Sequence, residues 1–237
     1  MAPDRRAELA TRLARVRTRI AEACAAAGRD RAAVTLVAVT KTYPASDVLH
    51  LAALGVRDIG ENRDQDAAPK AAEVAAAGEE VRWHFVGQLQ RNKARSVAGY
   101  ASLVHSVDSV RLARALGKAP RATPLEVLVQ VSIDGDPTRG GAIPGGDKET
   151  GLESVAEAVA GTDALTLRGV MAVAPLDWAP ERAFERLAGV AAELRAAYPT
   201  ADLISAGMSA DLEQAVAFGA THVRIGSALL GNRPALG

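Results

Sequence analysis

The sequence predicts a (β/α)8 barrel, a closed ring of parallel strands with helices around it. Its 237 residues divide into eight strand-then-helix units, one roughly every 25–30 residues, and such barrels usually need about 250 residues. The predicted strands are short and mostly apolar, as expected for strands buried on both faces of a parallel sheet. Because no break in composition divides the chain, we expect one domain over residues 1–237. An open doubly wound sheet is the alternative, but regular units without an evident edge strand favour closure.

Each predicted strand is a short apolar run between turn residues. The strands are expected at 36–40, 56–59, 82–86, 103–107, 126–132, 167–173, 201–205 and 222–225. Residues 134–150, between the fifth and sixth strands, are rich in Gly, Pro and charged residues. This stretch predicts a mobile loop rather than a linker between domains.

Helices are predicted where apolar residues recur every three or four positions and where capping residues mark an end. Gly28 suits the end of the first helix. Ser46 and Asp108 suit the start of two others, and the turn Gly207-Met208-Ser209 opens a further one. The helices are expected at 4–27, 46–54, 64–77, from about residue 90, from residue 108 to 116, at 152–160, 180–197 and 207–218.

The composition excludes several classes of function. Lys plus Arg and Asp plus Glu number 28 each, so no net charge attracts nucleic acid or an anionic membrane. No apolar run reaches the roughly 18 residues of a membrane span, and no apolar signal core follows the first arginines. The one cysteine, Cys24, falls on the apolar face of the first helix, which indicates a buried thiol in a reducing compartment. We therefore expect a cytoplasmic protein without nucleic-acid or membrane partners.

The common catalytic motifs are not found in the sequence. His50, His84, His105 and His222 are too far apart along the chain to show the spacing of a zinc site. There is no Gly-X-Ser-X-Gly elbow and no Walker-type loop. Glu61 is the only carboxylate at the end of a strand that draws attention.

Lys41 ends the first predicted strand. Lysine is seldom buried, so one explanation is an amine with a lowered pKa that attacks an aldehyde, and the other is a strand that simply leaves the core there. In a (β/α)8 barrel the active face lies at the carboxyl ends of the strands, and phosphate often binds after strands seven and eight. Turns of Gly and Ser at 207–209 and 226–227 occupy those positions. A lysine and a phosphate site on one face suggest pyridoxal 5'-phosphate (PLP), held by a Schiff base and by its phosphate.

Each of these features also has a purely structural interpretation. A Gly-X-Ser turn is more often a helix cap than a phosphate site. Arg224 lies within an apolar strand, where a directed role and a surface charge are equally expected. His84, between Trp83 and Phe85, is more often a hydrogen-bonded core residue than a base.

Several segments together carry a resemblance to a known family. One is Trp-His-Phe-Val-Gly-Gln-Leu-Gln-Arg-Asn-Lys at 83–93, and the others lie at 37–44, 60–63, 104–108, 167–175, 207–213 and 223–227. In these segments and their order, the chain resembles the pyridoxal phosphate homeostasis proteins over essentially its whole length. The resemblance implies a single barrel, like the N-terminal domain of alanine racemase, that holds PLP as an internal aldimine. It also implies control of the supply of free PLP rather than an established catalytic activity.

The resemblance also assigns roles to residues of this chain. Lys41 would be the Schiff-base lysine, and Arg224 would approach the pyridine nitrogen. The phosphate would be held by Ser209, Gly226, Ser227 and the backbone of Met208, and the cofactor would be lined by Asn62, His84 and Met171. The implied partners are PLP and PLP-dependent apoenzymes or enzymes of PLP synthesis, with the protein a monomer or a weak homodimer.

Two positions depart from the family pattern. Ser227 stands where threonine is common, which keeps the hydroxyl. Arg139 stands where lysine is typical, within a loop at 134–150 that is longer and richer in glycine than usual. The departures therefore affect contacts inferred for that loop and leave the expected cofactor site intact.

The residues favour a carrier of PLP over an enzyme. Arg224 stays charged and only donates hydrogen bonds, so it disfavours the protonated ring nitrogen that makes PLP an electron sink. Alanine racemases tolerate such an arginine because a tyrosine from a second domain supplies an opposing base. Here Tyr43 is the only tyrosine expected near the cofactor, on the same side as Lys41. We expect no turnover; the alternatives are an amino-acid racemase or other weak PLP-dependent enzyme with Lys41 as base, and a phosphate-binding barrel without PLP.

Overall fold

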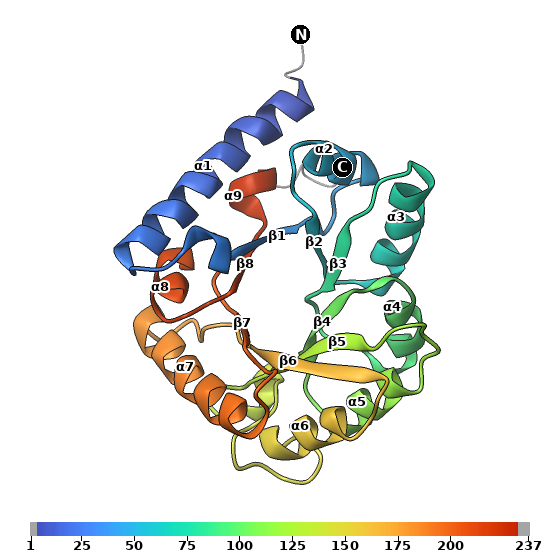
Figure 1. Cartoon of the computed structure of the whole chain (residues 1–237), viewed down its shortest axis with the longest axis vertical. Coiled ribbons are helices and arrows are strands. Elements are labelled where there is room, and N and C mark those ends of the chain that lie inside the picture. The colour runs from blue at the N-terminus through green and yellow to red at the C-terminus, as the bar shows by residue number, and fades with distance from the viewer. Residues whose placement is uncertain (1–3, 232–237) are drawn as a thin grey trace.

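The strands form a closed barrel in which each pairs in parallel with the next and the last pairs with the first (Figure 1). This computed structural model describes residues 4–231, so both ends of the expected domain 1–237 lie outside the described part. The predicted (β/α)8 barrel is confirmed, and the open sheet is excluded. The strands are β1 (Thr35–Val39), β2 (Asp58–Glu61), β3 (Arg82–Phe85), β4 (Leu103–Val107), β5 (Leu125–Gln130), β6 (Leu165–Met171), β7 (Leu203–Ser205) and β8 (His222–Ile225).

Helices surround the barrel (Figure 1). They are α1 (Arg5–Ala26), α2 (Ala45–Ala53), α3 (Asp64–Ala76), α4 (Ala94–Tyr100), α5 (Val110–Gly117), α6 (Leu152–Ala160), α7 (Pro180–Ala197), α8 (Leu212–Ala217) and α9 (Ser227–Leu230), with 3-10 turns η1 (Arg31–Ala33), η2 (Arg91–Lys93) and η3 (Pro137–Arg139). The helices predicted at 152–160 and 180–197 agree with α6 and α7 residue for residue.

The structure corrects three predicted helix starts. Helix α2 begins at Ala45, so Ser46 already lies inside its first turn. Helix α5 is capped by Ser109, whose Oγ accepts a hydrogen bond from the backbone of Leu112, rather than by Asp108. Helix α8 begins only at Leu212, so the turn at 207–209 does not open it. Each stretch offers more than one suitable capping residue, and the path of the chain out of the strand decides between them.

Strand β2 lies two residues later than predicted, at 58–61 instead of 56–59. Its pairing with β1 aligns Ile59 with Ala38 and Gly60 with Val39. This register carries Glu61 into the strand, where it is buried. The apolar pattern missed the shift because a buried carboxylate ends an apolar run in the sequence without ending the strand.

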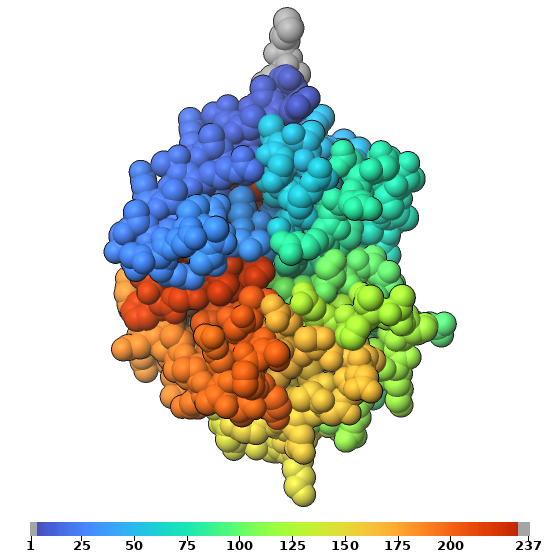
Figure 2. Space-filling model, viewed as in Figure 1, coloured from blue at the N-terminus to red at the C-terminus, as the bar shows by residue number. Residues whose placement is uncertain are grey.

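Helix α1 closes the ring across the junction of β1 and β8. It packs against α8 and α9, so the N-terminal and C-terminal regions lie side by side on the surface (blue and red in Figure 2). Its buried residues follow the predicted repeat of three and four positions, and the free thiol of Cys24 is buried among them. This contact supports the pairing that brings the ends of β1 and β8 together.

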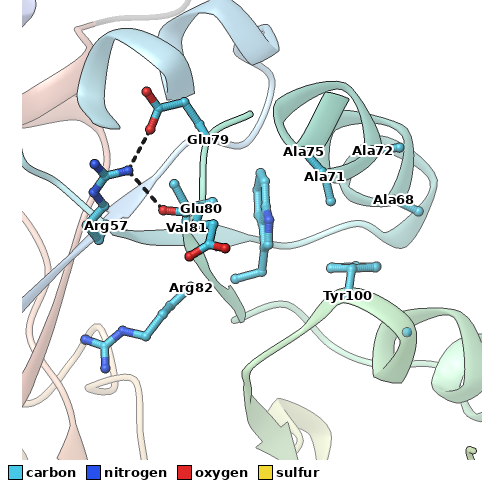
Figure 3. Close-up of a pocket in the computed structure, with 12 residues that line it drawn as sticks. Arg57, Ala68, Ala71, Ala72, Ala75, Glu79, Glu80, Val81, Arg82 and Tyr100 are labelled. Atoms are coloured by element: carbon cyan, nitrogen blue, oxygen red, sulfur yellow. Dashed lines mark hydrogen bonds and ion pairs between the residues drawn. The ribbon is translucent and has the colours of Figure 1, made fainter. Parts of the chain in front are cut away.

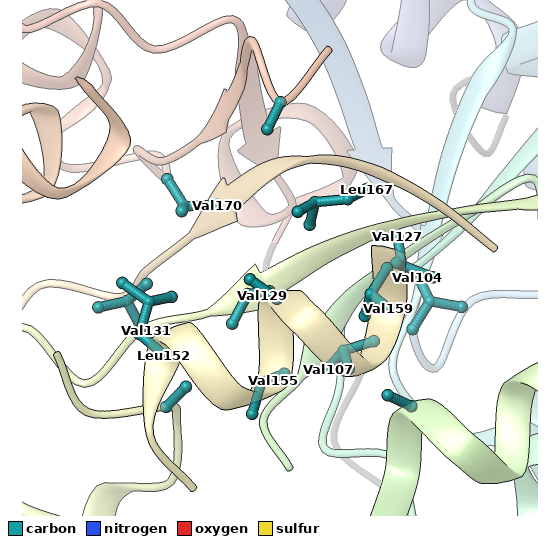
Figure 4. Packing of buried hydrophobic residues seen from close by; sticks show 14 of the residues in the cluster. Val104, Val107, Val127, Val129, Val131, Leu152, Val155, Val159, Leu167 and Val170 are labelled. Carbon is teal, nitrogen blue, oxygen red and sulfur yellow. The ribbon is translucent and has the colours of Figure 1, made fainter. Parts of the chain in front are cut away.

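An aliphatic layer between strands and helices supplies most of the apolar burial. Around β5 and β6 it consists of valines that pack against Leu152, Val155 and Val159 of α6 (Figure 4). These side chains are almost inaccessible to solvent. Burial of apolar surface stabilises a fold by roughly 25 cal/mol per Å², so this outer layer is the main source of stability.

The interior of the barrel is polar in large part. A small apolar cluster of Leu103, Leu128 and Met171 occupies one part of it. The other side chains that meet there come from β2, β3, β4, β7 and β8 and are joined by hydrogen bonds: Asp58, His84, His105, Ser205 and Arg224. Barrels of this class are usually filled with Val, Ile and Leu, and buried polar groups are tolerated only when they are hydrogen-bonded.

Burial keeps two interior histidines neutral. It lowers the pKa of His222 from 6.5 to about 4, with the nearby ring of His84 lowering it further. It also lowers the pKa of His105 well below the usual value of 6.5. Both imidazoles are therefore uncharged at neutral pH.

We predict that the protein loses stability as the pH falls from 6.5 towards 4. In the unfolded chain His222 binds a proton near pH 6.5, but in the folded chain it does so only near pH 4. The unfolded state therefore takes up more protons in this window, which lowers the free energy of unfolding by about 3 kcal/mol for this residue. His105 acts in the same direction. Denaturant titrations at a series of pH values measure the effect.

The matched variants are His222→Asn and His50→Gln. Asparagine can replace the ring Nδ1 at its hydrogen bond with Thr221 but takes up no proton, so His222→Asn should flatten the pH dependence. His50 lies on α2, outside the barrel, and its replacement should leave the dependence unchanged. Equal slopes in the wild type and His222→Asn would contradict a buried neutral His222.

We also predict that Gly169→Ala strongly destabilises the protein. Gly169 has a φ of +142°, and an added Cβ would lie 1.9 Å from the carbonyl oxygen of Leu203 on the neighbouring β7. Backbone strain and overpacking together should lower the free energy of unfolding by roughly 3–5 kcal/mol. Gly189→Ala in α7 is the control, because nothing lies within 4 Å of the added Cβ, and it should stabilise by about 0.5–1 kcal/mol. Denaturant midpoints distinguish the two.

Candidate functional site

Lys41 lies directly beyond β1, where the chain turns towards α2. The preceding Thr40 is fully buried, whereas Lys41 is exposed. Thr42 has a φ of +71°, in the left-handed region that few residues with a side chain adopt. The strand therefore does leave the core at Lys41, and it leaves through a tight, strained turn that presents the amine to solvent. Strain of this kind persists only where the surroundings enforce it.

A buried ion pair enforces the backbone beneath Lys41. The ammonium of Lys70 on α3 pairs with the carboxylate of Glu61 and donates to the carbonyl oxygen of Thr40 at 3.0 Å. The Thr40 hydroxyl donates to the same carboxylate at 2.7 Å. Glu61, the carboxylate noted in the sequence, thus faces α3 and holds the turn rather than facing the barrel mouth.

A pocket of about 240 Å³ brings Lys41 together with two of the predicted phosphate residues. Its lining comes from the ends of β1 and β8: Val39, Lys41, Thr42, Tyr43, Gly226, Ser227 and Gly231. The Tyr43 hydroxyl donates to the carbonyl oxygen of Gly231 at 2.8 Å, which ties the two walls together. The grouping follows from closure, because β1 and β8 are neighbours only in a closed ring.

Ser209 lies against the same turn. Its Oγ accepts a hydrogen bond from the backbone N–H of Ala228 at 3.3 Å and lies 3.4 Å from the Oγ of Ser227. The backbone N–H of Met208 already donates to Asp211 at 2.6 Å, and the Met208 side chain is 41% exposed. The two Gly-Ser turns therefore do meet, but the helix end expected at 207–209 is not there; at the second turn, α9 begins at Ser227, with Gly226 before it.

Arg224 lies inside the barrel, below these turns. Its Nη1 donates to Ser205 Oγ at 2.7 Å and its Nη2 to the carbonyl oxygen of Ala172 at 2.9 Å. Among residues 4–231, no carboxylate forms an ion pair with it. Burial lowers its pKa to about 10, so it remains a cation at neutral pH. Because Arg224 is buried, the interpretation of Arg224 as a surface charge is excluded.

Three other predicted residues do not line the pocket that contains Lys41. Met171 belongs to the apolar cluster of the interior, and His84 is buried deeper, between Asp58 and His105. Asn62 lines a second, polar pocket of about 550 Å³ formed by the loops after β2 and β3. In contact with it is Gly87, where an added Cβ would lie 2.1 Å from the Asn62 carbonyl oxygen. A cofactor contact of these residues stays a prediction.

Sequence reasoning missed three residues that the structure connects to Arg224: Asp58, His105 and Ser205. A signal existed, because His105 is a polar residue inside an apolar strand, as are His84 and Arg224. With strand alternation, such residues point to the face opposite the helices. What the pattern does not give is which of them touch.

A pocket of about 690 Å³ is lined by other residues. It lies against α3 and α4, with Ala68, Ala71, Ala72 and Ala75 on one side, and with Arg57 bonded to Glu79 and Glu80 on the other (Figure 3). Arg57 and Glu79 precede β2 and β3, so the pocket belongs to the amino ends of the strands. None of the predicted site residues lines it, and its size does not make it the site.

Two further features are absent from residues 4–231. No cluster of three or more His, Cys, Asp or Glu side chains there is suited to a metal ion. None of the helices in that part of the chain has the length and apolar character needed to cross a membrane.

Known proteins with similar sequences belong to the family that the sequence motifs indicate. Residues 12–234 match the family described as alanine racemase, N-terminal domain. The pyridoxal phosphate homeostasis protein of Mycobacterium tuberculosis H37Rv is 45% identical over 249 residues, 98% of this chain and 95% of that protein. That of Escherichia coli K12 is 37% identical over 234 residues, 95% of this chain and 97% of that protein.

Solved structures share the fold. PipY of Synechococcus elongatus PCC7942, solved with PLP bound, has a TM-score of 0.77 and 31% identity, with 94% of this chain and 100% of that chain covered. The alanine racemase of Corynebacterium glutamicum has a TM-score of 0.68 at 17% identity, with 98% of this chain and 64% of that chain covered. The second likeness concerns the fold alone.

Proposed function

The chain belongs to the family of pyridoxal phosphate homeostasis proteins, and on that premise we propose that it binds PLP and helps to control the supply of free PLP. Relatives at 37–45% identity over nearly the whole chain carry that name, and PipY, at 31% identity, was solved with PLP bound. The observation that carries the proposal is the grouping of Lys41, Gly226 and Ser227 in one pocket, with Ser209 beside it.

The chemistry of these groups fits PLP. Lys41 supplies an exposed primary amine, which is the group that would attach the aldehyde carbon covalently. Ser209 and Ser227 supply hydroxyl donors for the phosphate. Arg224 supplies a buried cation with no carboxylate partner among the described residues, suited to donate to the ring nitrogen. When bound, PLP supplies an electrophilic carbonyl carbon and an electron-withdrawing ring.

The same groups favour a carrier over a catalyst. A guanidinium cannot accept a proton from the ring nitrogen, so it keeps that nitrogen unprotonated and weakens the ring as an electron sink. Two-base chemistry also needs a second base opposite Lys41. The nearest candidate, Tyr43, lines the same pocket, and its hydroxyl is engaged by Gly231. Tyr100 packs on Trp83, on the helix side of β3.

We predict that Lys41 is the attachment point. Wild-type protein mixed with PLP should show a visible absorption band that Lys41→Ala lacks. Borohydride treatment should then fix PLP to the peptide that contains Lys41, as detected by mass spectrometry. Lys118→Ala removes an exposed lysine just beyond α5 and should behave as wild type. If the wild type shows no band and forms no adduct, Lys41 is only the residue at which the strand leaves the core. Turnover of an amino acid that Lys41→Ala abolishes would instead support an enzyme.

We also predict that Ser209→Ala weakens PLP binding. Loss of a hydrogen bond to a charged phosphate costs about 1.5–3 kcal/mol, or roughly tenfold to a hundredfold in Kd. Absorbance titration measures the change. Ser154→Ala in α6 is the control, because Ser154 lies on an outer helix away from the pocket. An unchanged Kd for Ser209→Ala would remove this hydroxyl from the phosphate site.

A further inference from the structure

A continuous series of hydrogen bonds crosses the interior of the barrel from Arg224 to Asp58. Arg224 Nη1 lies 2.7 Å from Ser205 Oγ, and Ser205 Oγ lies 2.8 Å from His105 Nδ1. The other ring nitrogen, His105 Nε2, lies 2.9 Å from His84 Nδ1. His84 Nε2 lies 2.9 Å from Asp58 Oδ1. The chain thus links five strands, β8, β7, β4, β3 and β2.

With one proton on each imidazole, the acceptor at the Asp58 end gives every hydrogen bond in this series a single direction. A guanidinium only donates and a carboxylate only accepts. Ser205 Oγ accepts from Arg224, and because Asp58 takes the Nε2 proton of His84, the order of donors along the two rings leaves the Ser205 proton to be donated to His105 Nδ1. With that nitrogen as an acceptor, the proton of neutral His105 lies on Nε2 and is donated to His84 Nδ1. The proton of His84 then lies on its Nε2, bonded to Asp58.

The chain is closed to water along most of its length. His84, His105, Ser205 and Arg224 are exposed by 3%, 0%, 0% and 6%. At the Asp58 end, Arg82 pairs with the same carboxylate oxygen at 2.7 Å and is itself 63% exposed. Because most of these groups are shielded from solvent, a change at one end affects the other members.

We propose that Asp58 is a positioning residue for the ligand of Arg224, acting through His84, His105 and Ser205. The proposal rests on the proposed function, in which Arg224 contacts PLP. The carboxylate holds both imidazoles in the Nε2–H form, and this keeps the lone pairs of Ser205 Oγ directed at Arg224. The guanidinium of Arg224 is thereby held in one orientation. Among the described residues, no carboxylate forms an ion pair with it directly. The acidic group that serves Arg224 thus lies at the other end of the barrel.

The ligand-free protein provides the first test. Nitrogen-15 NMR of labelled histidines distinguishes the two neutral forms of imidazole, and His84 and His105 should both be Nε2–H. Asp58→Ala removes the acceptor, so His84 can move its proton to Nδ1 and reverse the next bond. The signals of His105, which does not touch Asp58, should then change. A His105 in the Nδ1–H form in the wild type, or unmoved in Asp58→Ala, would overturn the proposal.

Binding of PLP provides the second test. Asp58→Ala should raise the Kd for PLP about tenfold, whereas Asp58→Asn, which keeps an oxygen acceptor for His84, should restore the histidine signals and most of the affinity. Asp202→Ala is the control. Asp202 pairs with Arg168 at the same end of the barrel and takes no part in the hydrogen bonds from Asp58 to Arg224. Wild-type affinity in Asp58→Ala would overturn the positioning role while leaving PLP binding intact.

The two proposals fail in distinguishable ways. Wild-type protein that binds no PLP would defeat both the proposed function and the positioning role, whereas the NMR signals would still report whether the hydrogen-bond chain has the stated direction. If Asp58→Ala does not fold, Ser205→Ala provides a second test. It removes the hydroxyl that links His105 to Arg224 and leaves the Asp58–His84 hydrogen bond in place. It should weaken PLP binding about tenfold with His84 still in the Nε2–H form. Unchanged affinity in Ser205→Ala would contradict the proposal.

Discussion

The burial of one guanidinium inside a closed barrel is the constraint on which the interior depends. Arg224 is tolerated there because Ser205 and the Ala172 carbonyl accept its hydrogen bonds. Ser205 also bonds to His105, and the hydrogen bonds continue through His84 to Asp58. Such an interior adds little apolar burial. The aliphatic layer outside the strands stabilises the fold and so permits the polar interior.

Closure of the barrel also determines the proposed binding site. Lys41 follows the first strand, whereas Ser209, Gly226 and Ser227 follow the last two, and they meet because β8 pairs with β1. The buried pair of Glu61 and Lys70 fixes the backbone just before Lys41. The result is an exposed amine on a rigid support, which suits a ligand that must be both held and released.

The likeness to alanine racemase shows how little a fold alone says about activity. The barrel is shared at 17% identity, and the comparison covers 64% of the racemase chain. Pocket size is no better a guide, because the pocket of about 690 Å³ at the amino ends of the strands contains none of the predicted residues. The function is inferred from which side chains meet at the ends of β1, β7 and β8.

Local patterns in the sequence were enough to predict the barrel and the order of its elements, and to single out Lys41, Arg224 and the Gly-Ser turns. These follow from local patterns: the strands at 103–107 and 222–225 and the helices at 152–160 and 180–197 agree with the structure residue for residue. The three-dimensional structure was needed to show that Ser209 lies beside Ser227 and that His105 bonds to Ser205, a residue 100 positions away. Strand alternation shows that a side chain faces inward. Which inward-facing side chains touch depends on the register and tilt of all eight strands, which no local pattern encodes.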